Sequence, residues 1–169
     1  MFLLKRCAFA SAALLGATLA GHADDAPVPE PIAAPGAATI VKLHAEGAQI
    51  YECKPDAQGH LVWTFREPIA TLMTEGQTVG RHYAGPNWDY QDGSGVTAKL
   101  AGTAPGATPK DIALLKLDVT AQRGSGILSA ATTVQRINTK GGKLEGACDK
   151  VAALQSVPYS ADYVFLKKP

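Results

Sequence analysis

Eight side chains that could bind a ligand are concentrated between residues 81 and 92. They are Arg81, His82, Tyr83, Asn87, Trp88, Asp89, Tyr90 and Asp92. Aromatic rings beside amide and carboxylate groups are what a sugar or a peptide stacks on and hydrogen-bonds to. Turn sequences at 85–87 and 92–95 would fix the shape of the segment, because Gly accepts positive φ and Pro presets φ. We therefore predict a ligand-facing loop over residues 81–94.

The competing interpretation makes this segment structural. Trp is highly buried on average, so Trp88 could be a core residue with Tyr83 as its partner. A metal or acid–base centre is poorly supported, since a strand at 88–90 would turn Asp89 away from the face that Trp88 shares with Tyr90. Asp92 is expected to cap its own turn through its side chain. We predict no metal ligand, no cofactor and no catalytic residue, because the serines also lack the strand–turn–helix context of a nucleophile.

The first 23 residues have the pattern of a secretory signal peptide. Lys5 and Arg6 supply the positive start, an uncharged run covers residues 7–20, and small residues follow at 21–23. The uncharged run is shorter than the roughly 20 residues that span a bilayer, and no later stretch is apolar for as long. We expect an exported protein, periplasmic or secreted, with no transmembrane segment after signal cleavage. An uncleaved N-terminal anchor is the alternative.

The charge balance of the expected mature chain excludes two partner classes. Removing Lys5 and Arg6 from 16 basic residues leaves 14 against 15 acidic residues, a net charge of −1. Without basic runs, neither nucleic acid nor anionic lipid is an expected main partner.

Two cysteines remain after signal cleavage, Cys53 and Cys148. In an oxidising compartment they should form a disulfide. Closing a loop of 95 residues (148 minus 53) would stabilise the fold by on the order of 4 kcal/mol. The alternative is a pair of free thiols, one of them a nucleophile, which would need a nearby base.

From residue 39 onward the chain carries strand patterns separated by Gly and Pro turns. Apolar and polar residues alternate at 60–66 and 113–122, and residues 127–138 look like one long strand. We predict a single all-β domain of about ten short strands, an antiparallel β-sandwich or a partly closed β-barrel. The expected inward side chains are Leu61, Trp63, Phe65, Leu115, Leu117, Val119 and Phe165. Residues 24–38, rich in Pro and Ala, are expected to be a leader or linker without apolar side chains to pack, or else to lie extended across the sheet.

Several short motifs in one order resemble a known family of secreted bacterial and fungal proteins. The motifs are QIYEC at 49–53, WTF at 63–65, VG at 79–80, HYAGP at 82–86, Trp88, DGS at 92–94, QRINT at 135–139, GG at 141–142, Cys148 and VPYSADY at 157–163. They cover nearly all of residues 45–165, and the family they resemble is the domain of unknown function 3455. That family usually has a Pro-Trp pair where this chain has Asp111 and Ile112. Residues 51–53 and 90–93 also resemble, more loosely, the periplasmic lysozyme inhibitors.

The function predicted from these features is a binding or interaction module of the cell envelope or extracellular space. Its partner would be an envelope glycan or a secreted protein. Two alternatives stay open: an extracytoplasmic, hydrolase-like enzyme and an inhibitor of a cell-wall-degrading enzyme. The oligomeric state is not predicted.

Overall fold

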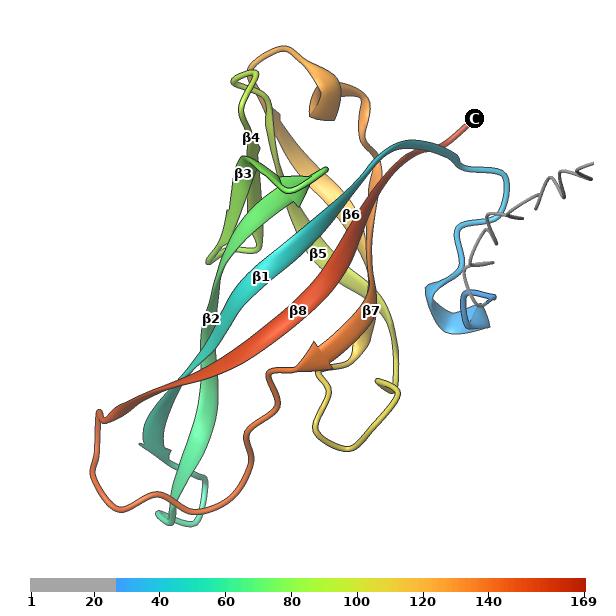
Figure 1. The fold of residues 1–169 in the computed structure, drawn as a ribbon. Coiled ribbons are helices and arrows are strands. Elements are labelled where there is room, and N and C mark those ends of the chain that lie inside the picture. The colour runs from blue at the N-terminus through green and yellow to red at the C-terminus, as the bar shows by residue number, and fades with distance from the viewer. Residues whose placement is uncertain (1–26) are drawn as a thin grey trace, which may run out of the picture.

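Eight antiparallel strands pair in chain order, and the first and last strands pair with each other to close the ring (Figure 1). The computed structural model describes residues 27–169, so the signal peptide predicted at 1–23 lies outside the described residues. The strands are β1 (Ala38–Pro55), β2 (Leu61–Thr74), β3 (Gln77–Tyr83), β4 (Asn87–Tyr90), β5 (Gly95–Ala104), β6 (Leu114–Arg123), β7 (Thr133–Gly141) and β8 (Leu154–Lys167). Two short 3₁₀ helices, η1 (Glu30–Ile32) and η2 (Ile127–Ala130), complete the elements of residues 27–169. The all-β prediction is confirmed, and of the two architectures proposed the structure is a barrel.

The predicted number of about ten short strands is wrong, because some strands are long. Residues 38–55 form one strand, β1, which continues through Gly47 without a turn. A Cβ at Gly47 would lie 2.1 Å from the carbonyl oxygen of Ile69 on β2, so this glycine permits close strand approach. The strand predicted at 127–138 is wrong in its first part, where the chain forms η2, and is confirmed from Thr133 onward, where β7 begins.

The barrel interior is filled by aromatic and aliphatic side chains. Leu117 and Phe165 are buried as predicted, and Leu115 and Val119 pack partly buried against the core. Leu61 and Trp63 are only partly buried, and the inward prediction is wrong for Phe65, which is 50% exposed. The reason is local: β3 pairs with β2 only from Ala70 to Thr74, so the first half of β2 has no β3 neighbour.

The segment before β1 packs on the barrel. Ile32 of η1 is fully buried, which corrects the expectation that residues 24–38 lack an apolar side chain to pack. Its cluster comprises Ala104, Ile137, Val164 and Leu166. The side chain of Gln135 donates to the carbonyl of Ile32 at 2.6 Å, and that of Lys116 donates to the carbonyl of Ala33 at 3.2 Å. Residues 30–37 therefore cover part of the outer face of β5 to β8.

A disulfide joins Cys53 to Cys148 with a Cα–Cα distance of 5.9 Å, which confirms the predicted pairing. The loop between β7 and β8 is held further by backbone hydrogen bonds from Cys148 to Leu61 and from Trp63 to Gly146, both 3.0 Å. The bridge thus fixes the loop against β1 and β2. Among the described residues, no helix has the length and apolar character needed to cross a membrane.

Candidate functional site

The β3–β4 hairpin divides the eight predicted binding residues between two faces. His82 pairs in register with Trp88, and Arg81 pairs with Asp89. His82 and Trp88 are buried on the inner face, where Tyr90 packs against the core. Arg81, Tyr83, Asn87 and Asp89 lie on the outer face, and Asp92 lies in the turn after β4. The predicted residues therefore do not form one surface, although the alternation of Trp88 and Tyr90 against Asp89 is as expected.

The outer-face residues form a network of paired charges. Asp89 accepts from the Nη2 atoms of both Arg81 and Arg123, at 2.9 and 2.8 Å. Burial opposes ionisation of this carboxyl, but the hydrogen bonds from Arg123 and Arg81 outweigh it and lower the pKa of Asp89. Arg123 also donates to the hydroxyl of Thr97 at 2.7 Å, and Arg81 lies 4.7 Å above the ring of Tyr83. The network links β3, β4, β5 and β6, and its acceptors are already occupied.

Asp92 has a structural role in the turn. One carboxylate oxygen accepts from the backbone N–H of Ser94 at 2.9 Å, and the other accepts from that of Ile127 at 2.7 Å. Hydrogen bonds, first of all from the Ser94 hydroxyl, lower the pKa of Asp92. The expected side-chain cap is present, and it also ties the turn to the start of η2.

On the inner face, Trp88 is the centre of an aromatic cluster. Its ring stacks on His82, with centroids 4.4 Å apart and planes at 9°, and meets Tyr163 and Phe165 edge-on at 5.4 and 6.1 Å. Trp88 is 1% exposed, so the interpretation as a core residue is correct. The prediction that Tyr83 packs against Trp88 is wrong, because Tyr83 lies on the other face of the hairpin.

His82 is a neutral imidazole inside the barrel. Its Nδ1 lies 2.8 Å from the carbonyl oxygen of Asn87, which can only accept, so Nδ1 carries the proton. Burial lowers the pKa of His82 to about 3, and the positive charge of Arg136 adds to the decrease. Nε2 therefore has a free lone pair, and His82 lines a cavity.

The cavity exists because β3 and β4 are short. β4 pairs with β5 only from Gly95 to Thr97, and β3 leaves the first half of β2 without a partner on that side. The barrel wall is therefore incomplete next to the β3–β4 turn at residues 84–86. A cavity of about 360 Å³ opens there between β2 and β5. It is lined by Phe65, Arg66, Pro68, His82, Ala84, Gly85, Pro86, Trp88, Leu100, Leu115, Leu117, Arg136 and Tyr163. We call it the lateral pocket.

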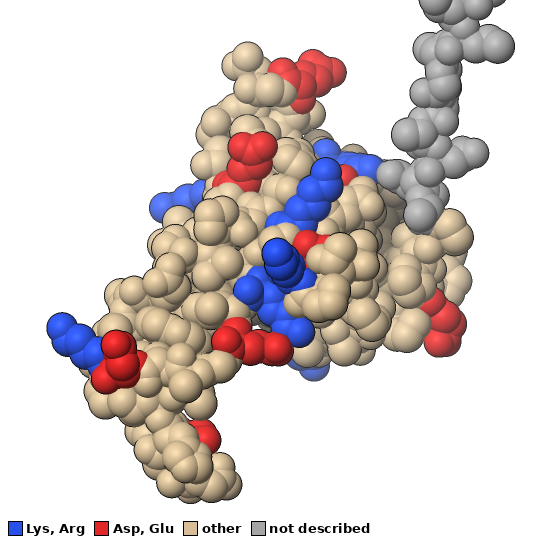
Figure 2. Space-filling view, turned by 60° about the horizontal axis from the view of Figure 1, so that its bottom comes forward, with Lys and Arg blue, Asp and Glu red and all other residues tan. Residues whose placement is uncertain are grey.

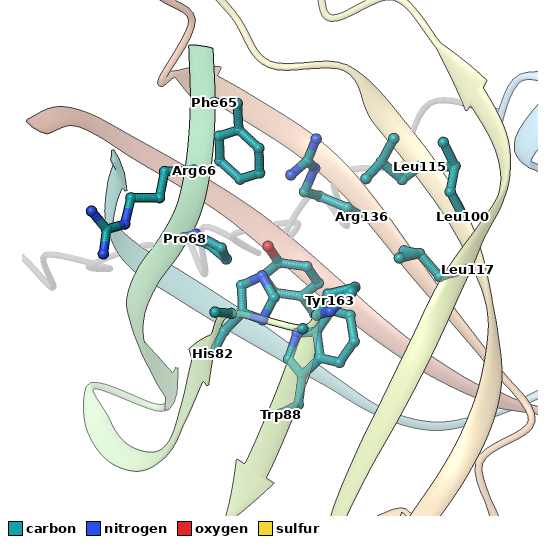
Figure 3. Close-up of a pocket in the computed structure, with 13 residues that line it drawn as sticks. Phe65, Arg66, Pro68, His82, Trp88, Leu100, Leu115, Leu117, Arg136 and Tyr163 are labelled. Carbon is teal, nitrogen blue, oxygen red and sulfur yellow. The ribbon is translucent and has the colours of Figure 1, made fainter. Parts of the chain in front are cut away.

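The lateral pocket is mostly apolar and has an apolar rim. Phe65 and Leu100 are 50% and 60% exposed. Figure 3 shows His82, Trp88 and Tyr163 gathered at one end, the leucines along one side, and the guanidinium of Arg136 between Phe65 and Leu115. A second cavity of about 480 Å³ shares Phe65, Leu115 and Arg136 with it and reaches the disulfide-held loop at 143–145.

Of the residues predicted to bind, only His82 and Trp88 line the lateral pocket. Sequence reasoning missed the other lining residues, because the pocket arises from strands of unequal length. Arg136 and Tyr163 lie in two of the family motifs, and that was the available signal for them. No group of three His, Cys, Asp or Glu side chains that could hold a metal occurs among residues 27–169.

The fold and the pocket define a structural class of protein, a closed antiparallel barrel of eight strands in residues 27–169 with an apolar pocket in its side wall. The family is also established, since a family model described as "Protein of unknown function (DUF3455)" matches residues 34–167. The chain belongs to this family, and the resemblance found in the sequence is confirmed. Searches of curated proteins and of solved structures found no significant match.

Proposed function

We propose that this protein is an exported binding protein that holds a small, largely apolar molecule in the lateral pocket. The observation that carries the proposal is the pocket itself. Its volume of about 360 Å³ lies in the range of small-molecule sites, roughly 300 to 1,000 Å³, and its lining combines aromatic and aliphatic side chains with few polar groups, as such sites do. Export is supported by the signal pattern in the sequence and by the disulfide between Cys53 and Cys148.

A glycan or protein partner on the outer face has less support. Trp88 is inside the barrel, and the outer charges of Arg81, Asp89 and Arg123 are already paired with one another. On the surface shown in Figure 2, Lys and Arg are interspersed with Asp and Glu among many uncharged residues. The same observations weaken the inhibitor alternative, because an inhibitor needs an exposed, unpaired recognition surface.

The hydrolase alternative would need an activated nucleophile. His44 and Asp162 lie 2.9 Å apart on the outer face, which is the geometry of an acid–base pair. In the part of the chain that the structure describes, no Ser, Thr or Cys side chain is hydrogen-bonded to His44, whose other nitrogen faces Glu46 at 3.6 Å. We therefore favour binding over catalysis.

The test is a titration of the mature protein with the neutral solvatochromic dye Nile red. Saturable binding with one dye per chain is expected. Leu100→Glu places a charge at the exposed rim of the pocket and should weaken binding roughly tenfold or more, because the charge must be desolvated or kept out of the apolar mouth. Ile69→Glu is the matched control, since Ile69 is 56% exposed on β2 but does not line the pocket. Non-saturable binding, or equal losses in the two variants, would show the proposal to be wrong.

A further inference from the structure

Arg136 carries a charge in a row of side chains that faces the barrel interior. On β7 it pairs in register with Leu115 of β6 on one side and with Tyr163 of β8 on the other. Directly opposed residues of neighbouring strands point to the same face. All three line the lateral pocket, so the guanidinium is delivered to the pocket by the strand register.

The positive charge of Arg136 has no counter-ion. Its Nε and Nη2 atoms donate to the carbonyl oxygen of Ala113 at 3.0 and 2.8 Å, and a guanidinium carries more donors than these two bonds use. No Asp or Glu of residues 27–169 lies within 4.0 Å of it. Arg136 is partly buried, and an unpaired charge costs free energy to the extent that it is removed from water, so a counter-charge at this position would be stabilising.

The other cations near these cavities are paired, which sets Arg136 apart. Arg66 forms ion pairs with Glu67 at 3.2 Å and with Glu52 at 3.7 Å, and in Figure 3 its side chain points away from the pocket. Lys143, in the second cavity, pairs with Glu145 at 3.1 Å. Arg136 is thus the uncompensated cation of the described lining.

Further donors in these cavities lack acceptors. The indole nitrogen of Trp88 in the lateral pocket and the amide nitrogen of Gln49 in the second cavity are buried without a hydrogen-bond partner. Nearly all buried polar groups in proteins have a partner, and both of these atoms are donors. Together with Arg136, these donors favour a ligand that supplies acceptor oxygens, while the free lone pair of His82 Nε2 is an acceptor in the same lining that would take a donor instead.

We infer that the ligand of the lateral pocket is an amphipathic carboxylic acid, with its carboxylate bound by Arg136 and its apolar part lying among Phe65, Leu100 and Leu117. The inference rests on the proposed function and adds the chemical class of the ligand. A carboxylate matches the planar fork of a guanidinium and supplies the missing counter-charge. The exposed apolar rim suits the entry of the apolar part.

The experiment measures displacement of bound Nile red by octanoic acid, octanol and octylamine, which share one chain length and differ in the head group. At neutral pH the acid should displace the dye at a concentration roughly tenfold or more below that of the alcohol, about 1.4 kcal/mol, since its head group forms a charge-assisted hydrogen bond with Arg136. The amine should be weaker than the alcohol, because its ammonium group would face Arg136.

The matched variants separate the anchor from the rest of the lining. Arg136→Gln should remove the preference for acid over alcohol while octanol still displaces the dye, and Arg136→Lys should keep part of the preference. Arg123→Gln, which removes a cation of the outer face, should leave the preference intact. Should Arg136→Gln fail to fold, the wild-type acid–alcohol comparison and Arg136→Lys still decide the question.

The outcomes distinguish the inference from the proposed function. Equal displacement by acid and alcohol in the wild-type protein overturns the role of Arg136 but leaves apolar binding standing. A preference that survives in folded Arg136→Gln has the same consequence. Failure of the dye itself to bind saturably overturns the proposed function instead.

Discussion

Acidification should destabilise this protein well above the pH range in which its carboxyl groups titrate, because His82 is buried as a neutral ring. Its pKa is about 3 in the folded protein against an ordinary value of 6.5. Below pH 6.5 the unfolded chain therefore binds a proton at this position that the folded chain excludes. Stability contributed by the neutral ring is present above pH 6.5 and is lost as the pH falls from 6.5 towards 3.

The expected loss follows from proton linkage. Each pH unit below 6.5 costs about 1.4 kcal/mol, so lowering the pH from 7 to 5 should reduce the free energy of unfolding by about 2 kcal/mol. The carboxyl groups with lowered pKa belong to Asp89, Asp92, Asp111 and Asp162. Their linked losses begin lower, near pH 5, where the unfolded carboxyl groups start to take up protons. Between pH 7 and 5 these carboxyl groups therefore contribute little, and the His82 variant described below measures the share of His82.

The assay is urea unfolding of the disulfide-intact protein at pH 7, 6 and 5, followed by the fluorescence of Trp63 and Trp88. His82→Phe keeps a ring against Trp88 but cannot titrate, so its free energy of unfolding should change little across this interval. His60→Gln is the control, because the His60 side chain is 78% exposed and its replacement should leave the wild-type slope in place. If His82→Phe loses stability as steeply as the wild-type protein, the proton is taken up elsewhere and the reasoning about His82 is refuted.

Two further predictions concern what holds the barrel together. Trp88→Ala should reduce the free energy of unfolding by about 3 to 5 kcal/mol, because it removes the centre of the aromatic cluster. Denaturant titration measures this loss, and a value below about 1 kcal/mol would contradict the place of Trp88 in the core. Reducing the bridge between Cys53 and Cys148 should cost a few kcal/mol, at most about 4 to 5 for a separation of 95 residues, and should release the loop at 143–153 to protease. Intact mass with and without reductant checks the bridge itself, and two alkylatable thiols in the native protein would exclude it.

Local features of this chain could be read from the sequence because they depend on near neighbours. Alternating side chains placed Trp88 and Tyr90 on one face of a strand and Asp89 on the other, and a strand has this period wherever it lies. The cap that Asp92 forms is a contact two residues away along the chain. The pairing of Cys53 with Cys148 was determined by number, since only two cysteines follow the predicted signal peptide.

The tertiary structure decided what depends on distant partners. Alternation is the same in a sandwich and in a barrel, so closure through β1 and β8 could not be told from it. Gly47 admits the close approach of the β2 backbone, a role that depends on which strand pairs with β1. The exposure of Phe65 and the position of Arg136 in the lateral pocket both result from how far each strand pairs with its neighbour. Those lengths are set by contacts between residues far apart in the chain, and for that reason the pocket exists only in the folded barrel.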